Sequence, residues 1–282
     1  MSEPSTVTEP AERIAPAPAR TAYRSTFLTV MRSEWSKIRT LRSASYTLLA
    51  AVALGVGFGC LITFADARAY GTLSAADQAA WDPTGRSLSG VVMAQLAIGL
   101  LGSLVLTSEY ATGMIRTSLT VVPNRARLLA AKTVVFALIA LVAGEVIGFV
   151  SFFLGQAVLN GQHVPAATLG QPEVLRSVIG CGLYLAVVGL LGVAVGVLVR
   201  ATAGAISIVA AATFLVPAFT PALPDSLAKF VGTYWPSMAA RQLLLVHHDP
   251  GVLPPWTGFW LMAAAVAVVL AAAFAVFQRR DA

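Results

Sequence analysis

The sequence predicts an all-α, polytopic membrane protein with six transmembrane helices, and three observations support this fold class. Of the 282 residues, 57% are hydrophobic and only 11% are charged, whereas soluble globular chains are about 45–50% apolar and about 25% charged. The mean hydropathy is +0.77. Six apolar stretches are long enough to cross a bilayer as helices. A soluble domain and a largely disordered chain are therefore both excluded.

The predicted spans form one membrane domain over residues 44–282. None of them shows the alternating hydrophobicity of a membrane β-strand, and a helix satisfies its own backbone hydrogen bonds inside the bilayer. Because only three residues separate the fourth span from the fifth, we expect a tight helical hairpin there. The spans run over residues 44–65, 88–107, 133–159, 178–199, 203–221 and 256–277.

The polar N-terminal region precedes the first span and divides into two parts. Residues 1–22 are rich in Pro, Ala, Glu and Thr, which predicts a disordered tail. In residues 23–43, apolar side chains recur at helical spacing and the basic side chains lie mostly off that stripe, as in an amphipathic helix at the membrane interface. A basic segment that only sets topology is the alternative. The residues expected at the interface are Trp35, Lys37, Arg39 and Arg42.

The basic residues are distributed unevenly between the two sides of the predicted membrane domain. Fourteen of the 19 Lys and Arg residues fall on the side that carries both termini, while the acidic residues outside the spans divide evenly. Since Lys and Arg are enriched in cytoplasmic segments, both termini are predicted to be cytoplasmic. Topology then explains the net charge of +6, and we expect no nucleic-acid partner.

The longest connection between spans on that side is residues 108–132, SEYATGMIRTSLTVVPNRARLLAAK. Gly113 interrupts the preceding helix, and an apolar stripe at helical spacing follows it. Pro123 and Asn124 then predict a turn before a basic entry into the third span. We expect a short amphipathic helix, a turn and a basic segment that together form a surface for a cytoplasmic partner. The alternative is a basic loop that only sets topology.

This segment resembles the corresponding loop of the ABC-2 type permease family. The similarity lies in the pattern E-Y-x-x-G-x-I-R-x-x-L-x-x-x-P-x-R-x-R-x-x-x-x-K between the second and third of six spans, and in the N-terminal stretch SEWSKIRTLRSASYTLL. The span count, the cytoplasmic termini and the long outer segment before the last span are also similar. The resemblance covers roughly residues 23–282.

The resemblance implies that this loop holds a coupling helix that docks on a separate ATPase subunit, which binds ATP and Mg²⁺. It further implies a second permease, identical or different, with substrate passing through the interface between the two in the plasma membrane. Residue 114 is Met, where Thr is frequent in similar chains. The coupling residues implied are Glu109, Tyr110, Gly113, Arg116, Leu119, Pro123, Arg127 and Lys132.

The chain carries no P-loop of its own. Such a loop needs a glycine-rich turn followed by Gly-Lys-Ser or Gly-Lys-Thr. Of the three lysines, only Lys132 precedes a hydroxyl residue, and no glycine lies among the six residues before it. An external energy source is therefore required if the protein is a pump, and we expect no cofactor on this chain.

Glu145 is the only acidic residue inside a predicted span and lies near the middle of the third. A charge at that depth costs about 2.5–3.5 kcal/mol on insertion scales. Two hypotheses are therefore open: a role in the substrate path or in proton linkage, or a neutral carboxyl group that bonds to a neighbouring helix.

Other features carry weaker predictions. The pairs Gly55/Gly59, Gly144/Gly148 and Gly192/Gly196 have the spacing of close helix contacts, within the chain or at a dimer face. The segment 221–255 is expected to form short helices at the outer mouth, because a bare loop of that length is unusual. Adjacent histidines cannot easily share one ion, so no metal site is predicted at residues 247–249.

The predicted function is the membrane permease of an ABC transporter, most simply an exporter of an amphipathic molecule, and not an enzyme. The alternatives are a non-transporting membrane scaffold or immunity-type protein, and an intramembrane enzyme that uses Glu145 and the outer histidines. Neither paired carboxylates within the spans nor a G-x-S-x-G or H-E-x-x-H motif supports the enzyme.

Overall fold

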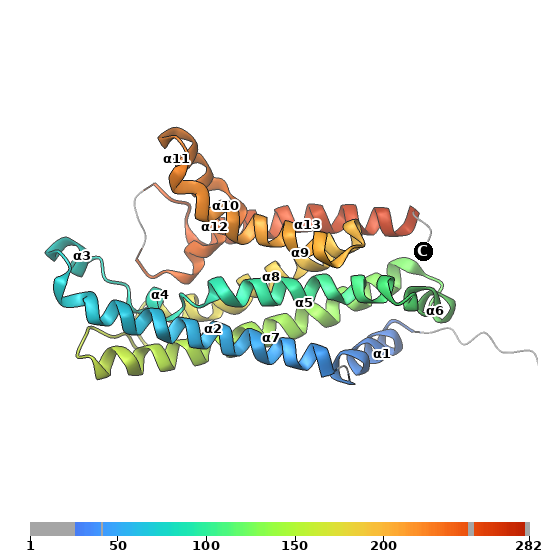
Figure 1. Cartoon of the computed structure of the whole chain (residues 1–282), viewed down its shortest axis with the longest axis horizontal. Coiled ribbons are helices and arrows are strands. Elements are labelled where there is room, and N and C mark those ends of the chain that lie inside the picture. The colour runs from blue at the N-terminus through green and yellow to red at the C-terminus, as the bar shows by residue number, and fades with distance from the viewer. Residues whose placement is uncertain (1–25, 41, 248–250, 280–282) are drawn as a thin grey trace, which may run out of the picture.

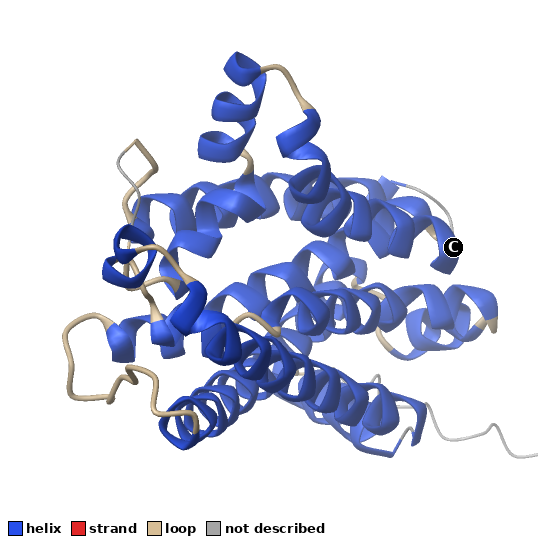
Figure 2. Ribbon diagram, turned by 60° about the vertical axis from the view of Figure 1, so that its left-hand side comes forward, coloured by secondary structure: helices blue, strands red, loops and turns tan. Residues whose placement is uncertain are grey.

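The computed structural model describes residues 26–40, 42–247 and 251–279, apart from the side chains of residues 42–44. The predicted tail, residues 1–22, lies outside this part of the chain. The described residues form helices joined by loops and contain no strand (Figure 2). Six of the described helices are long and apolar enough to cross a membrane. The all-α, six-span fold class is thereby confirmed.

Most helical ends of the spans extend beyond the predicted apolar stretches, except that the second span begins three residues after the predicted start and the fourth ends at the predicted residue. The first, second and third spans are α2 (Arg42–Ala69), α5 (Val91–Ala111) and α7 (Arg125–Gly161). The fourth is α8 (Val174–Val199), the fifth begins with α9 (Thr202–Ala210), and the sixth is α13 (Pro255–Arg279). Helix α7 begins eight residues before the predicted boundary at Thr133, because the Asn124 side chain caps it by accepting a hydrogen bond from the Arg127 N–H at 2.9 Å.

Helix α8 is the centre of the bundle and packs against α5, α7, α9 and α13. Glycines make these contacts close: a Cβ atom at Gly144 would meet Gly182 of α8, and one at Gly192 would meet the Gly99 carbonyl of α5. Gly55 faces Ala94 of α5 in the same way. The predicted glycine pairs therefore pack within the chain, where small residues let helix backbones approach closely.

The fifth span is interrupted in its middle, a break that was not expected from its apolar sequence. After α9, a π-helical turn covers Ala211–Leu215, and α10 (Val216–Phe219) and the 3₁₀ turn η3 (Thr220–Ala222) complete the span. The π-helical turn, in which the Val216 N–H bonds to the Ala211 carbonyl, and Pro217, which has no N–H to donate, together release the carbonyl groups of Ala212 and Thr213 from the helix ladder. The indole N–H of Trp235 donates to the Ala212 carbonyl at 2.7 Å, and the Gln95 amide donates to the Thr213 carbonyl at 3.1 Å.

Two of the three connections between spans at one end of the bundle contain short helices. Between α2 and α5 lie η1 (Tyr70–Thr72), α3 (Ala75–Ala79) and α4 (Pro83–Ser87). The helices predicted in the segment 221–255 are present as α11 (Asp225–Tyr234), α12 (Pro236–Arg241) and the 3₁₀ turn η4 (Gln242–Leu244). Figure 1 shows α11 projecting from the bundle, while α12 packs on α13. We call this the α4 end.

The opposite end carries α1 (Phe27–Thr40), α6 (Met114–Val121), the turn between α8 and α9, and the last residues of α13 (Figure 1). We call it the α6 end. Helix α1 lies within the predicted interfacial helix, residues 23–43, and packs on α7. Residues 23–25 and 41 of that prediction lie outside the described part of the chain.

Candidate functional site

Helix α6 joins the second span to the third and is the candidate site. Gly113 ends the preceding helix in the left-handed conformation, with φ of 71°, which glycine adopts without steric cost. Ile115 is buried and Leu119 packs beside it, whereas Met114 and Arg116 are exposed. The predicted order of short amphipathic helix, turn and basic re-entry is confirmed.

A cluster of four charged side chains lies directly beneath α6, and we call it the charge cluster: Glu34, Lys37, Glu109 and Lys132. The Lys132 ammonium donates to a Glu109 carboxylate oxygen at 2.5 Å and to Glu34 at 2.7 Å. Lys37 completes the ring with contacts to Glu34 at 3.0 Å and to Glu109 at 3.2 Å. The cluster thus joins α1, the end of α5 and the start of α7.

The cluster is buried and electrically balanced. Lys132 is 2% exposed, Glu34 4% and Glu109 8%. Two carboxylates and two ammonium groups have no net charge, and each buried charge lies beside opposite charges, which offsets the cost of removing it from water. Deleting one member would leave another buried without compensation.

Lys37 is the most solvent-accessible member of the cluster. Burial lowers the pKa of Lys37, but hydrogen bonds to Glu34 and Glu109 and the attraction of both carboxylates outweigh it, so the pKa is raised above its ordinary value. The ammonium also lies 3.4 Å from the hydroxyl of Ser118 in α6. Lys37 therefore links α1 to α6 in its charged form.

The turn between α8 and α9 contacts the same region. The guanidinium of Arg200 stacks over the Tyr110 ring, 4.9 Å from its centroid. Arg200 holds a left-handed conformation, with φ of 57°, at the end of α8. Thr202, the first residue of α9, hydrogen-bonds the hydroxyl of Thr107 in α5 at 3.0 Å. The end of α5 is therefore in contact with α1, α7 and the α8–α9 turn.

The residues proposed for coupling consequently fall into two groups. Glu109 and Lys132 are buried in the charge cluster, while Tyr110 and Leu119 are half-buried against the bundle. The exposed group is Gly113, Arg116, Pro123 and Arg127.

The proposed interfacial residues of α1 divide in the same way. Trp35 and Arg39 are exposed, whereas Lys37 belongs to the charge cluster. Arg42 is the first residue of α2, and its side chain lies outside the described part of the structure.

Glu34 and Arg200 were not identified from the sequence as residues of the site. Glu34 is the acidic residue of an otherwise basic helix, three positions before Lys37, and this spacing was the available signal. Arg200 had no local signal beyond its place between two spans. In both cases the partner lies far away in the sequence: Lys132 is 98 residues from Glu34.

Glu145 lies on α7, half-buried, with its carboxyl group against Gly182 of α8. One of its oxygens, Oε2, is buried and has no hydrogen-bond partner among the described residues. His247 instead lines a separate cavity of about 330 Å³ at the α4 end, with Trp81 and Asp82. Within the described chain, the two elements of the enzyme alternative are therefore not brought together, while His248 and Asp249 lie outside it.

Comparison with known proteins agrees with this architecture. A search of curated proteins gave no match. The sequence profile described as ABC-2 family transporter protein matches residues 30–218, which include α6, the whole charge cluster, the first four spans and most of the fifth. This match covers more than half of the chain, and the multi-pass helical bundle described above therefore belongs to the ABC-2 transporter family, as a membrane permease of an ABC transporter.

Proposed function

We propose that this chain is the permease subunit of an ABC exporter and that α6 is its contact with a separate ATPase subunit. The observation that carries the proposal is the charge cluster, which joins the base of α6 to α1 and α7 through Lys132. A surface helix that must transmit force needs a stiff attachment. Buried, paired charges with defined geometry supply one.

The exposed face of α6 supplies the docking surface. Met114 is 51% exposed and Arg116 is also exposed, while Ile115 between them is buried in the bundle. Apolar side chains and arginines are enriched at the centres of protein interfaces. ATP and Mg²⁺ bind to the ATPase, whose closure moves α6 and, through the cluster, α1, α5 and α7 together.

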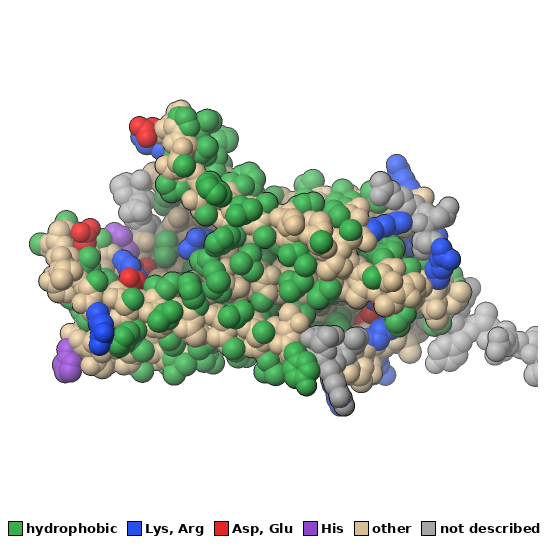
Figure 3. Space-filling view, viewed as in Figure 1, with side chains coloured by type: hydrophobic (Ala, Val, Ile, Leu, Met, Phe, Trp, Pro, Cys, Tyr) green, Lys and Arg blue, Asp and Glu red, His purple; other side chains and the backbone are tan. Residues whose placement is uncertain are grey.

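Charge distribution supports placing the α6 end in the cytoplasm. Among the described side chains, the α6 end carries nine basic and two acidic residues, whereas the α4 end carries five of each. Figure 3 shows Lys and Arg side chains gathered over the α6 end. This bias follows the positive-inside rule and supports cytoplasmic termini. The plasma membrane is the location that we propose for the chain.

A second permease, identical or different, completes the substrate path. The fifth span is among the least buried of the six, and Ile208, Leu215 and Phe219 present large apolar side chains along it. These side chains face lipid or a second permease, because the described chain does not cover them. The helices alternate between two packings, and this alternation moves the substrate across the membrane. Nucleotide binding on the ATPase selects between the two packings.

The test is retention of the ATPase by variants of the α6 surface. The full-length chain is purified with its ATPase from native membranes in mild detergent, and bound ATPase is measured by vanadate-sensitive ATP hydrolysis and by mass spectrometry. R116A should reduce retention about fivefold or more, because interface arginines are frequent hot spots. The matched control is R39A, which removes an exposed positive charge of α1 at the same end and should retain the ATPase.

Both variants should unfold at the wild-type temperature, since neither side chain is buried. The proposal is wrong if the wild-type chain retains no ATPase, or if R39A and R116A lose it equally.

A further inference from the structure

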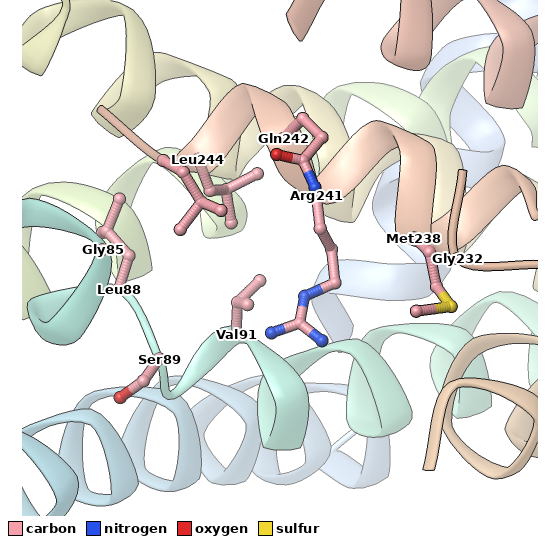
Figure 4. A pocket seen from close by; sticks show the side chains of 10 residues that line it. Gly85, Leu88, Ser89, Val91, Gly232, Met238, Arg241, Gln242 and Leu244 are labelled. Atoms are coloured by element: carbon pink, nitrogen blue, oxygen red, sulfur yellow. The ribbon is translucent and has the colours of Figure 1, made fainter. Parts of the chain in front are cut away.

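A cavity of about 140 Å³ opens at the α4 end, between the start of α5 and the helices α11 and α12 (Figure 4). It is several times larger than one water molecule needs. Apolar side chains form most of its walls: Leu88, Val91, Met238, Leu244 and Leu245. The cavity is therefore suited to a ligand that is at least partly apolar.

Arg241 is the one charged residue among those that line this cavity. Figure 4 shows its guanidinium reaching from the end of α12 across the cavity toward Val91. Within the described chain it has no ion pair and no hydrogen bond. Arg86 and Arg176 at the same end are different, because they pair with Asp66 and Glu173. Arg241 thus presents uncompensated positive charge to the cavity.

The acidic residue beside the cavity wall does not compensate this charge. Asp82 accepts hydrogen bonds from the backbone N–H groups of Gly85 at 2.9 Å, Val246 at 2.8 Å and His247 at 3.2 Å. Its oxygens therefore already accept hydrogen bonds that cap α4 and hold the segment after η4. That segment forms part of the cavity wall.

The wall is held in place by these bonds and by Arg176. The Arg176 guanidinium donates to the carbonyl of Leu245 at 2.5 Å, and the next residue is bound by Asp82. Leu243 packs closely on Gly180 of α8. The cavity is consequently formed before a ligand arrives, which reduces the ordering cost of binding.

The depth of Arg241 follows from the packing of α12 on α13. Ala239 lies against Gly258, where a Cβ atom could not fit. Trp256 and Trp260 flank Gly258 in sequence, and both are exposed on the bundle surface. Tryptophans gather at the headgroup level of a bilayer. Arg241, two residues after Ala239, therefore lies near that level.

We propose that this cavity binds the anionic headgroup of an amphipathic molecule, with Arg241 contacting its phosphate or carboxylate group and the leucine and valine side chains contacting its first methylene groups. An arginine fork matches the geometry of both anions. The proposed function is needed only for one part of this proposal, namely that the bound amphiphile is the transported substrate. Binding itself requires no ATPase.

The experiment measures binding to the purified full-length chain in a neutral maltoside detergent by isothermal titration calorimetry. The probes are dihexanoyl phosphatidic acid, dihexanoyl phosphatidylcholine and inorganic phosphate, which separate an anionic amphiphile from a zwitterionic one and from a free anion. The wild-type chain should bind the phosphatidic acid at least about tenfold more tightly than the other two.

Three variants locate the site. R241Q should weaken phosphatidic acid binding about tenfold or more, because it removes a charge-assisted hydrogen bond. R241K keeps the positive charge but not the planar guanidinium geometry, and its affinity for phosphatidic acid should fall about threefold. The matched control K229Q removes an exposed positive charge of α11 outside the cavity, and should change affinity less than about twofold.

A fourth variant tests the cavity without changing charge. Gly232 lines the cavity, and a Cβ atom there would meet nothing within 4 Å, so G232F adds a bulky ring at the cavity wall without a collision at Cβ. It should also weaken binding about tenfold. This variant decides the question if R241Q does not yield folded protein.

The proposal is overturned if K229Q and R241Q weaken binding equally, if G232F binds like the wild type, or if phosphate alone or the phosphatidylcholine binds as tightly as the phosphatidic acid. These outcomes are independent of the α6 test. If R116A releases the ATPase but the cavity variants bind normally, only the headgroup site is wrong. If no ATPase associates while Arg241-dependent binding persists, only the transporter assignment is wrong.

Discussion

Lys132 at the start of α7 and Glu109 at the end of α5 form a buried ion pair 2.5 Å long, which closes the chain around α6. Both residues belong to the motif that resembles the family's coupling loop, yet they point into the bundle. Their role is therefore to position α6. The surface that we propose faces the ATPase consists of other residues of the same motif.

The first prediction concerns Lys132. K132M should lower the free energy of unfolding by about 3–5 kcal/mol, because it leaves Glu109 and Glu34 buried with only Lys37 as a partner. Thermal unfolding in detergent and size-exclusion chromatography measure the loss. R116A, an exposed residue on α6, serves as the control and should unfold like the wild type.

A double variant separates charge from shape in the same cluster. K132M/E109Q restores electrical balance and should be more stable than K132M alone. Equal stability of the two variants would contradict the electrostatic interpretation of the cluster.

The second prediction is a pH dependence that comes from Lys37. Its pKa is raised in the folded state, so its stabilising contribution is fully present below the unfolded value of about 10.5 and is lost as the pH rises through the folded value. The melting temperature of the wild type should therefore fall more steeply above about pH 10 than that of K37M. Parallel curves for the two proteins over the alkaline range would show that Lys37 does not titrate as described.

The third prediction compares two glycines in spans. A Cβ atom at Gly102 of α5 would collide with the backbone of Gly189 in α8, whereas at Gly57 of α2 it would meet nothing within 4 Å. G102A should destabilise the protein by about 1–3 kcal/mol or more, because backbone cannot move aside as a side chain can. G57A should be neutral, or stabilising by up to about 1 kcal/mol. Similar effects of the two substitutions on the melting temperature would refute this packing.

The fourth prediction tests the interrupted fifth span. Trp235 and Ser237 both donate hydrogen bonds to the Ala212 carbonyl, at 2.7 Å and 3.1 Å. In W235F or S237A one donor remains, so each should cost about 0.5–1.5 kcal/mol. The double variant leaves the carbonyl without these donors and should cost more than the sum. Protease susceptibility of residues 211–237 and thermal unfolding measure the effect, with W256F as the aromatic control. Strict additivity would mean that the two donors do not share one acceptor.

Much of the fold was predictable because its signals are local. A stretch of about 20 apolar residues specifies a span wherever it occurs. Gly113, Pro123 and Asn124 mark the ends of the helices around α6 through their own backbone preferences. The break in the fifth span was harder to predict from the sequence. Pro217 is a local signal, but proline is tolerated in transmembrane helices, and only the donors Gln95 and Trp235 show that the released carbonyls are satisfied.

The sequence by itself determined the six spans, their connections, the short helix between the second and third, and the charge bias from which orientation is proposed. Only the tertiary structure decided which residues of that connection are buried. Helical periodicity defines a face within one helix, but it does not show what covers that face. From the sequence alone, Glu109 and Lys132 are charged residues of an exposed loop. In the folded chain Lys132 lies between Glu109 and Glu34 of the first helix and pairs with both. Likewise, Arg241 was one more charge in the outer segment until packing of α12 placed it, unpaired within the described chain, in an apolar cavity.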